Sequence, residues 1–233
     1  MKNKPIIGII GKVQPKEDFD FWHRIDEVDE FRYYIVKKGG IAIILLPSQK
    51  TINFNNNDIK DDTILTKEEL EDLYRQINLC DGFILQGGLV SCSYEVEMAK
   101  KIIELDKPLL GICAGFNNIL RALGTDVVED KTNSHNFYEK GYRHNIKIEK
   151  HSIIYDIIKK EEYSVNSIHS MIAKKEMLKD YVKISSYSLD NLVESFELEN
   201  KNFVVGIKWH PEIMDDEFMD KLFELFLKKC KKS

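Results

Sequence analysis

The sequence is poor in cysteine. Among its 233 residues there are four, and no two of them form a Cys-x-x-Cys pair. This low density excludes the disulfide framework of a small secreted domain and a structural zinc knot. We therefore expect reduced thiols at all four positions, which are Cys80, Cys92, Cys113 and Cys230.

Long apolar runs and an excess of basic residues are also absent. The first apolar run ends at Lys12, too early for a signal peptide core, and no later run reaches about 18 apolar residues. The formal net charge is −5, with Lys and Arg spread along the chain, which argues against a nucleic-acid or membrane partner. We expect a cytoplasmic protein with a small-molecule partner.

No internal repeat and no clear linker divides the chain. A 233-residue chain with 43% hydrophobic residues can bury one substantial core. The Asn- and Asp-rich stretch at 53–62 is predicted to be a surface loop. We therefore expect one domain over residues 1–233, and, since homodimers are the commonest oligomers, a homodimer.

In the first half, nearly continuous apolar runs alternate with helical patterns. Such runs are typical of parallel strands covered on both faces, and this order predicts an open, doubly wound sheet. In the second half, shorter alternating segments predict antiparallel or edge strands added to the same sheet. The predicted strands are 6–10, 41–46, 83–85 and 108–112, then 144–149, 181–188, 192–199 and 203–210; the predicted helices are 27–40, 66–79, 94–105 and 215–232.

Cys113 lies at an abrupt junction between a predicted strand and a predicted helix. Gly111 and Gly115 flank it and remove side chains that would collide at a tight corner. A thiol at such a nucleophile elbow is exposed at the sheet edge, and the helix N-terminus lowers its pKa. A small buried cysteine that ends a core strand would give the same local pattern.

A second element, WHPE, contains a histidine and a glutamate two residues apart. A cysteine nucleophile needs a base, and the base needs an acceptor that orients it, which His210 and Glu212 supply. Alone, this spacing is also that of an ordinary surface histidine. Together with the elbow it favours a catalytic triad of Cys113, His210 and Glu212.

These motifs carry a family resemblance. GICAGFN resembles the G-x-C-x-G-x-Q element of class I glutamine amidotransferases, and WHPE resembles their His and Glu element. Within that superfamily the chain is most similar to the γ-glutamyl-γ-aminobutyrate hydrolase family, since KPIIGI, KKGGIAIILLP, GFILQGG, VNSIHS and VGIKWHPE occur in that family's order. The resemblance implies a flavodoxin-like, three-layer α/β/α fold and hydrolysis of a γ-glutamyl amide or isopeptide bond.

The resemblance also implies roles for further residues. Amides of Gly87 or Gly88 and of Ala114 would form the oxyanion hole, and Asn166, Ser167 and His169 would face the substrate. Glu194 aligns with a family carboxylate and is either an exposed strand residue or a ligand for a substrate amine. Asn117 stands where the family usually has Gln, and the loop after Gly88 is shorter than usual, so the substrate side departs from the family pattern.

The expected reaction forms a γ-glutamyl thioester on Cys113 and releases an amine and then glutamate, without a metal or an organic cofactor. A glutaminase subunit of a synthase and a non-catalytic binding protein on the same fold are the alternatives. A DJ-1-like protein would have His where Ala114 stands. Metal-dependent hydrolysis would need a cluster such as His135, His144 and His151, whose spacing fits no zinc pattern.

Overall fold

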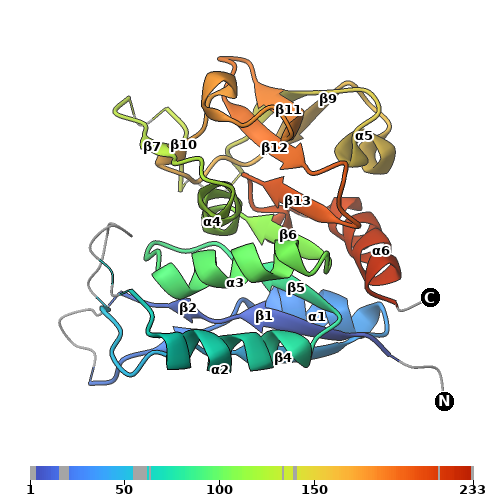
Figure 1. The fold of residues 1–233 in the computed structure, drawn as a ribbon. Coiled ribbons are helices and arrows are strands. Elements are labelled where there is room, and N and C mark those ends of the chain that lie inside the picture. Colours follow the sequence, from blue (N-terminus) through green and yellow to red (C-terminus); the bar gives the residue numbers. More distant parts are fainter. Residues whose placement is uncertain are drawn as a thin grey trace.

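A nine-stranded sheet runs through the protein (Figure 1). The computed structural model describes residues 4–15, 21–54, 62, 64–132, 134–138, 141–214 and 216–231. The strand order is β4-β1-β5-β6-β13-β12-β11-β8-β9. The strands are β1 (Ile6–Ile10), β4 (Ile41–Leu45), β5 (Gly82–Leu85), β6 (Leu109–Ile112), β8 (His144–Ile148), β9 (Glu162–Val165), β11 (Lys183–Ser188), β12 (Val193–Glu197) and β13 (Val204–Ile207).

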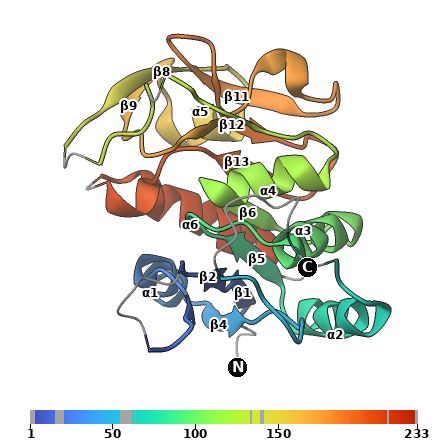
Figure 2. The ribbon, with the colours of Figure 1, turned by 90° about the vertical axis from the view of Figure 1, so that its left-hand side faces the viewer.

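Helices cover both faces of this sheet (Figure 2), and each face has its own apolar core. Successive strand residues point to opposite faces, so Leu109 of β6 enters one core whereas Leu110 and Ile112 enter the other. One face carries α2 (Lys67–Asn78), α3 (Ser93–Glu104) and α4 (Ala114–Ala122). The other carries α1 (Asp29–Lys37), α5 (Ile153–Ile158) and α6 (Phe218–Cys230).

Two small strand pairs and two short 3-10 helices complete the described structure. The pair of β7 (Val128–Glu129) with β10 (Met171–Ile172) borders the cleft that is described below. The other pair is β2 (Lys12–Val13) with β3 (Ile25–Asp26). The 3-10 helices are η2 (Lys175–Met177) and η3 (Pro211–Ile213).

The architecture confirms the predicted three-layer, mostly parallel α/β fold. Strands β4, β1, β5, β6 and β13 run parallel, and the strands from β13 to β9 pair antiparallel. No helix among the described residues has the length and apolar character that crossing a membrane requires.

One strand differs in part from its prediction. The segment 203–210 was predicted to be an antiparallel or edge strand; β13 does pair antiparallel with β12, but it lies in the interior of the sheet and pairs in parallel with β6 on its other side. All four of its residues are buried, which is the environment of a parallel strand covered on both faces. Helix α5 and strand β9 were not predicted, and residues 55–61 of the predicted loop lie outside the described residues.

Candidate active site

Cys113 occupies the corner between β6 and α4. Its backbone has φ of +52°, a left-handed value that is strained for a residue with a side chain. The close approach of helix to sheet depends on Gly115, because a Cβ there would lie 2.0 Å from the carbonyl oxygen of Leu85. The Cys113 amide donates a 2.8 Å hydrogen bond to the carbonyl oxygen of Ile207, so β13 fixes the corner from the other side.

His210 and Glu212 follow β13, next to this corner. The Nδ1 atom of His210 lies 2.5 Å from Oε1 of Glu212, which is buried within η3. Gly87 closes the gap beneath the imidazole, because a Cβ there would lie 2.6 Å from His210 Cε1 and 3.4 Å from Cys113 Cβ. The structure therefore brings all three predicted catalytic residues together, from two neighbouring parallel strands.

The contact between thiol and imidazole changes the acidity of both groups. Burial alone would raise the pKa of Cys113, but the charge and hydrogen bond of His210 hold the pKa of the thiol below its ordinary value. Burial alone would lower the pKa of His210, but Cys113 and Glu212 hold it well above its ordinary value. The pair therefore favours thiolate and imidazolium, the form in which a thiol is nucleophilic.

The predicted oxyanion residues divide between two positions. Gly88 and Ala114 line a cleft together with Cys113, whereas Gly87 packs against His210. Gly88 has φ of +149°, and a Cβ there would lie 2.7 Å from Lys12 Cε. Lys12 is itself buried and forms a 2.8 Å ion pair with Glu95, so a buried ion pair packs against Gly88.

The cleft has a volume of about 740 Å³ and opens beside Cys113. Its wall includes the β7–β10 pair and the segment that carries His169. Side chains of both charge signs line it, namely Arg121, Asp126 and Glu129. Tyr138, an exposed residue of the segment 130–144, also lines the cleft. Phe21 and Trp22, which are exposed residues of the segment 14–30, do not line it. Phe19 of the same segment lies outside the described residues.

Two of the five residues predicted to bind substrate line this cleft, namely Asn117 and His169. Asn166 instead holds the backbone of His210, since its Oδ1 accepts from the His210 amide at 2.8 Å and its Nδ2 donates to the His210 carbonyl at 2.6 Å. Ser167 is buried and donates to the carbonyl oxygen of His135 at 2.9 Å. Glu194 is fully buried and is not a lining residue of the cleft.

Lys208 is a residue of the site that the sequence patterns did not single out. Its side chain is buried, and its Nζ donates to Asn117 Oδ1 at 2.6 Å and lies 5.0 Å from the centre of the Phe116 ring. Burial lowers the pKa of this amine to about 8. Lys208 lies directly before WHPE in the predicted strand 203–210. Because successive strand residues point to opposite faces, this position could have suggested a buried side chain.

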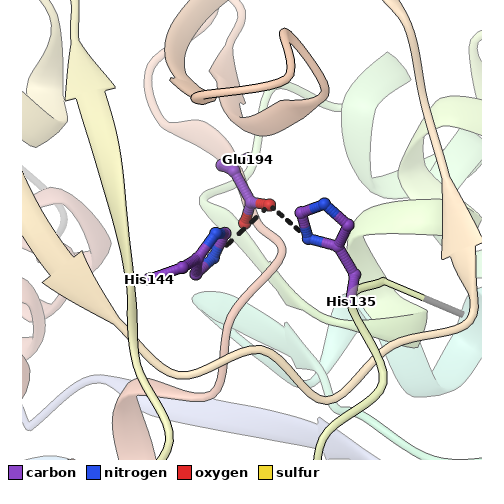
Figure 3. Close-up of side chains that lie close together, drawn as sticks. All are labelled: His135, His144 and Glu194. Atoms are coloured by element: carbon purple, nitrogen blue, oxygen red, sulfur yellow. Dashed lines mark ion pairs between the residues drawn. The ribbon is translucent and has the colours of Figure 1, made fainter.

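The structure also groups histidines that are far apart in the sequence. The rings of His135 and His144 lie 5.2 Å apart, centre to centre, and both approach Glu194 (Figure 3). His169 stacks on the other side of His135, also at 5.2 Å, and burial lowers the pKa of His169 to about 4. His151 is exposed and is not part of this group.

The chain is similar in sequence to known proteins. Residues 92–212 match the family described as Peptidase C26. The glutamine amidotransferase-like protein YvdE of Lactococcus lactis is 26% identical over 234 residues, which cover 95% of this chain and 97% of that protein. The γ-glutamyl-γ-aminobutyrate hydrolase PuuD of Escherichia coli is 25% identical over 138 residues, 53% of this chain and 54% of the relative.

Solved structures share the fold at lower identity. The glutaminase domain of CTPS from Trypanosoma brucei, solved with bound acivicin, superimposes with a TM-score of 0.65 at 15% sequence identity. The superposition covers 97% of this chain and 94% of that domain. At this identity the likeness concerns the fold, which is that of class I glutamine amidotransferases.

Proposed function

The chain belongs to the Peptidase C26 family, and we propose that it is a cysteine hydrolase that cleaves the γ-glutamyl amide bond of a small molecule. The observation that carries the proposal is the thiol of Cys113, which lies at a strained elbow beside an imidazole that a buried carboxylate orients. This arrangement of nucleophile, base and orienting acceptor is the one that acyl transfer requires.

In the first half-reaction, the Cys113 thiolate attacks the γ-carbonyl carbon and forms a carbon–sulfur bond. The amides of Gly88 and Ala114 donate to the resulting oxyanion; one such donor typically contributes about 3 kcal/mol to lowering the barrier. The His210 imidazolium gives its proton to the nitrogen of the scissile bond. That bond then breaks, the amine leaves, and the γ-glutamyl group remains on sulfur as a thioester.

In the second half-reaction, the neutral imidazole of His210 takes a proton from water as the water oxygen attacks the thioester. The tetrahedral intermediate collapses, and the carbon–sulfur bond breaks with both electrons on sulfur. Glutamate leaves, and the thiolate–imidazolium pair is restored. Glu212 accepts a hydrogen bond from Nδ1 throughout, which keeps Nε2 as the nitrogen that exchanges the proton.

The cleft suits the charged head group of a glutamyl substrate. Arg121, whose Nε forms a 3.4 Å ion pair with Asp126 Oδ1, offers a cation for the α-carboxylate, and Glu129 offers an anion for the α-ammonium group. Lys208 donates a hydrogen bond to the side-chain amide of Asn117 and orients it. Asn117 is one methylene shorter than the Gln usual in the family, and the long side chain of Lys208 lies behind it. We infer that the glutamyl half of the substrate binds here and that the amine half extends toward the open end of the cleft.

The assignment is tested with Cys113→Ala and a panel of γ-glutamyl amides that includes free glutamine. We expect wild-type protein to release glutamate, and the variant to lose at least about 10³-fold in kcat, because no thioester can form. Cys80→Ala is the matched control, since Cys80 is a buried core thiol away from the cleft. Equal turnover by wild type and Cys113→Ala would contradict the proposal.

A glutaminase that supplies ammonia to a synthase is the second candidate, because one structural relative is a glutaminase domain. The same panel separates the two functions. A glutaminase would act on free glutamine and depend on a partner enzyme for its activity, whereas the proposed hydrolase acts alone on substituted amides. Inactivity of pure protein on the whole panel, with no labelling of Cys113 by an electrophilic glutamine analogue, would favour a binding protein.

A further inference from the structure

A cluster of metal-binding side chains lies behind the cleft wall, separate from Cys113. Figure 3 shows His135, His144 and Glu194 pointing toward one another from three different segments. His135 lies between β7 and β8, His144 begins β8, and Glu194 belongs to β12. One ligand atom from each residue lies within 4.8 Å of the other two.

The carboxylate at the centre of this cluster has no hydrogen-bond donor. Glu194 has no exposed surface, and neither of its oxygens accepts a hydrogen bond from any residue in the described ranges. Its Oε1 lies 3.6 Å from His169 Nε2, 3.7 Å from His135 Nδ1 and 3.8 Å from His144 Nε2, and all three distances are too long for hydrogen bonds. A buried carboxylate without a hydrogen-bond partner is costly, and a cation held between Glu194, His135 and His144 would supply the missing contact.

The spacing of the ligand atoms fits a four-coordinate metal ion. Zinc binds imidazole nitrogen and carboxylate oxygen at about 2.0–2.2 Å, which puts neighbouring ligand atoms of a tetrahedral site about 3.3–3.6 Å apart. The two carboxylate–imidazole separations of 3.7 and 3.8 Å exceed this range by a few tenths of an ångström, and the separation between the two imidazole nitrogens is within 4.8 Å. A small inward movement of the side chains would complete the coordination of a metal ion. Direct hydrogen bonds between Glu194 and the two imidazoles would require a larger movement.

A second carboxylate orients one of the ligands. His135 Nε2 lies 3.0 Å from Asp190 Oδ2, so this nitrogen donates its proton outward and leaves the lone pair on Nδ1 facing Glu194. Ser167 Oγ is 3.2 Å from Nδ1, but its single proton goes to the carbonyl oxygen of His135 at 2.9 Å. A histidine whose outer nitrogen donates to a carboxylate is the usual arrangement around a zinc ion.

We propose that His135, His144 and Glu194 bind a divalent transition-metal ion of the zinc class. The ion joins the segment before β8 to strands β8 and β12, and water completes the coordination. Its role is structural, because none of the three ligands lines the cleft that opens beside Cys113. By fixing His135, it fixes the Ser167 and His169 segment that forms one wall of the cleft.

The site is tested by titrating metal-free protein with Zn²⁺ in a calorimeter and with Co²⁺ in a spectrophotometer. Both titrations use the Cys113→Ser protein, so that the active-site thiolate does not bind the probe. We expect one equivalent of each metal, and visible absorption typical of four-coordinate Co²⁺ with nitrogen and oxygen ligands. Binding of Zn²⁺ that is absent, or weaker than about 1 μM, would overturn the proposal.

Variants assign the ligands. In the same background, Glu194→Gln and His144→Ala are expected to weaken Zn²⁺ binding at least about 10-fold and to abolish the Co²⁺ absorption. His151→Asn is the matched control, because His151 is exposed and lies outside the cluster. If Glu194→Gln fails to fold, His144→Ala decides alone, and unchanged binding by that variant would show that His135, His144 and Glu194 act only as an ion-pair network. Since metal binding is measured without turnover, its failure is distinct from failure of the proposed hydrolase activity.

Discussion

Single residues hold His210 in place. Asn166 forms two hydrogen bonds to its backbone, and Gly87 leaves only the space that the imidazole fills. Both residues had been expected in other roles, Asn166 at the substrate and Gly87 in the oxyanion hole. The structure supports a positioning role for each.

This role of Asn166 gives a prediction at the residue scale. Asn166→Ala removes both hydrogen bonds to His210, and a shift of the imidazole by about 1 Å lowers kcat on the order of 100-fold, with little change in KM. Asn166→Asp keeps the acceptor for the His210 amide and should recover part of the loss. Kinetics with the best substrate of the panel measure both; a rise in KM with unchanged kcat would instead indicate a direct substrate contact.

The shifted pKa values of the thiol and imidazole predict the pH dependence of hydrolysis. Activity should rise as the thiol ionises, below the ordinary pKa of cysteine, and fall only as the imidazolium loses its proton, well above the ordinary pKa of histidine. In Glu212→Gln the carboxylate that raises the pKa of His210 is gone, so the alkaline limb of kcat/KM should move to lower pH. An alkaline limb that does not move would argue against this contact.

At the scale of single residues, the motifs of the sequence indicated Cys113, His210 and Glu212 together because a nucleophile at an elbow requires a base. They did not indicate the contact of Lys208 with Asn117 or the cluster around Glu194. These groups depend on which side chains meet across β12, β13 and the loops, and such distances have no counterpart in sequence spacing. His135 and Glu194, for example, come within 3.7 Å only after the antiparallel half of the sheet has formed.

At the scale of elements, helix α2 offers a test of stability that is independent of the site. Thr66 and Glu69 form a capping box, in which each side chain accepts from the other's backbone amide. Thr66→Ala removes one half of it and should lower the free energy of unfolding by about 1 kcal/mol. Urea denaturation measures this change, and kcat should be unchanged because α2 is on the opposite side of α3 from the cleft.

Element boundaries followed from the sequence where one signal dominated. The apolar runs of β1, β4, β5 and β6 are continuous and end in glycine or proline neighbourhoods, so strand ends came within one residue. Helix α5 is only six residues long and shows too little periodicity to be detected. Strand β13 is equally apolar, but the strands that precede it in the sequence, β11 and β12, are alternating. Its parallel pairing with β6 depends on the order of strands in the whole sheet, which the sequence pattern does not give.

At the scale of the whole molecule, buried thiols predict loss of stability in alkali. Burial raises the pKa of Cys80 to about 11 and that of Cys92 to about 12, and it raises the pKa of Cys230 further. The unfolded chain therefore binds fewer protons than the native protein above pH 9. The stability that these thiols contribute is complete below pH 9 and is lost as the pH rises toward 11 or 12.

Lys208 acts in the opposite direction. Its folded pKa of about 8 lies below the ordinary value, so the cost of its buried charge is relieved as the pH rises above 8. One lysine offsets about one of the three thiols, and the net effect is a fall in the free energy of unfolding.

Urea unfolding under reducing conditions from pH 8 to 10.5 measures this fall. In Cys80→Ala the free energy of unfolding should fall less steeply with pH, by about 1.4 kcal/mol per pH unit. A free energy of unfolding that does not change with pH in the wild type would contradict the prediction.

The pairing of β13 with β6 also has a consequence during protein synthesis. A ribosome adds about 5–20 residues per second, and roughly a hundred residues separate the nucleophile from its base, so Cys113 is synthesised about 5–20 seconds before His210. Until then β13 cannot fix the elbow, and no imidazole lowers the pKa of the thiol. In a nascent chain the three side chains of the proposed triad are therefore not yet assembled, and they come together only when β13 pairs with β6.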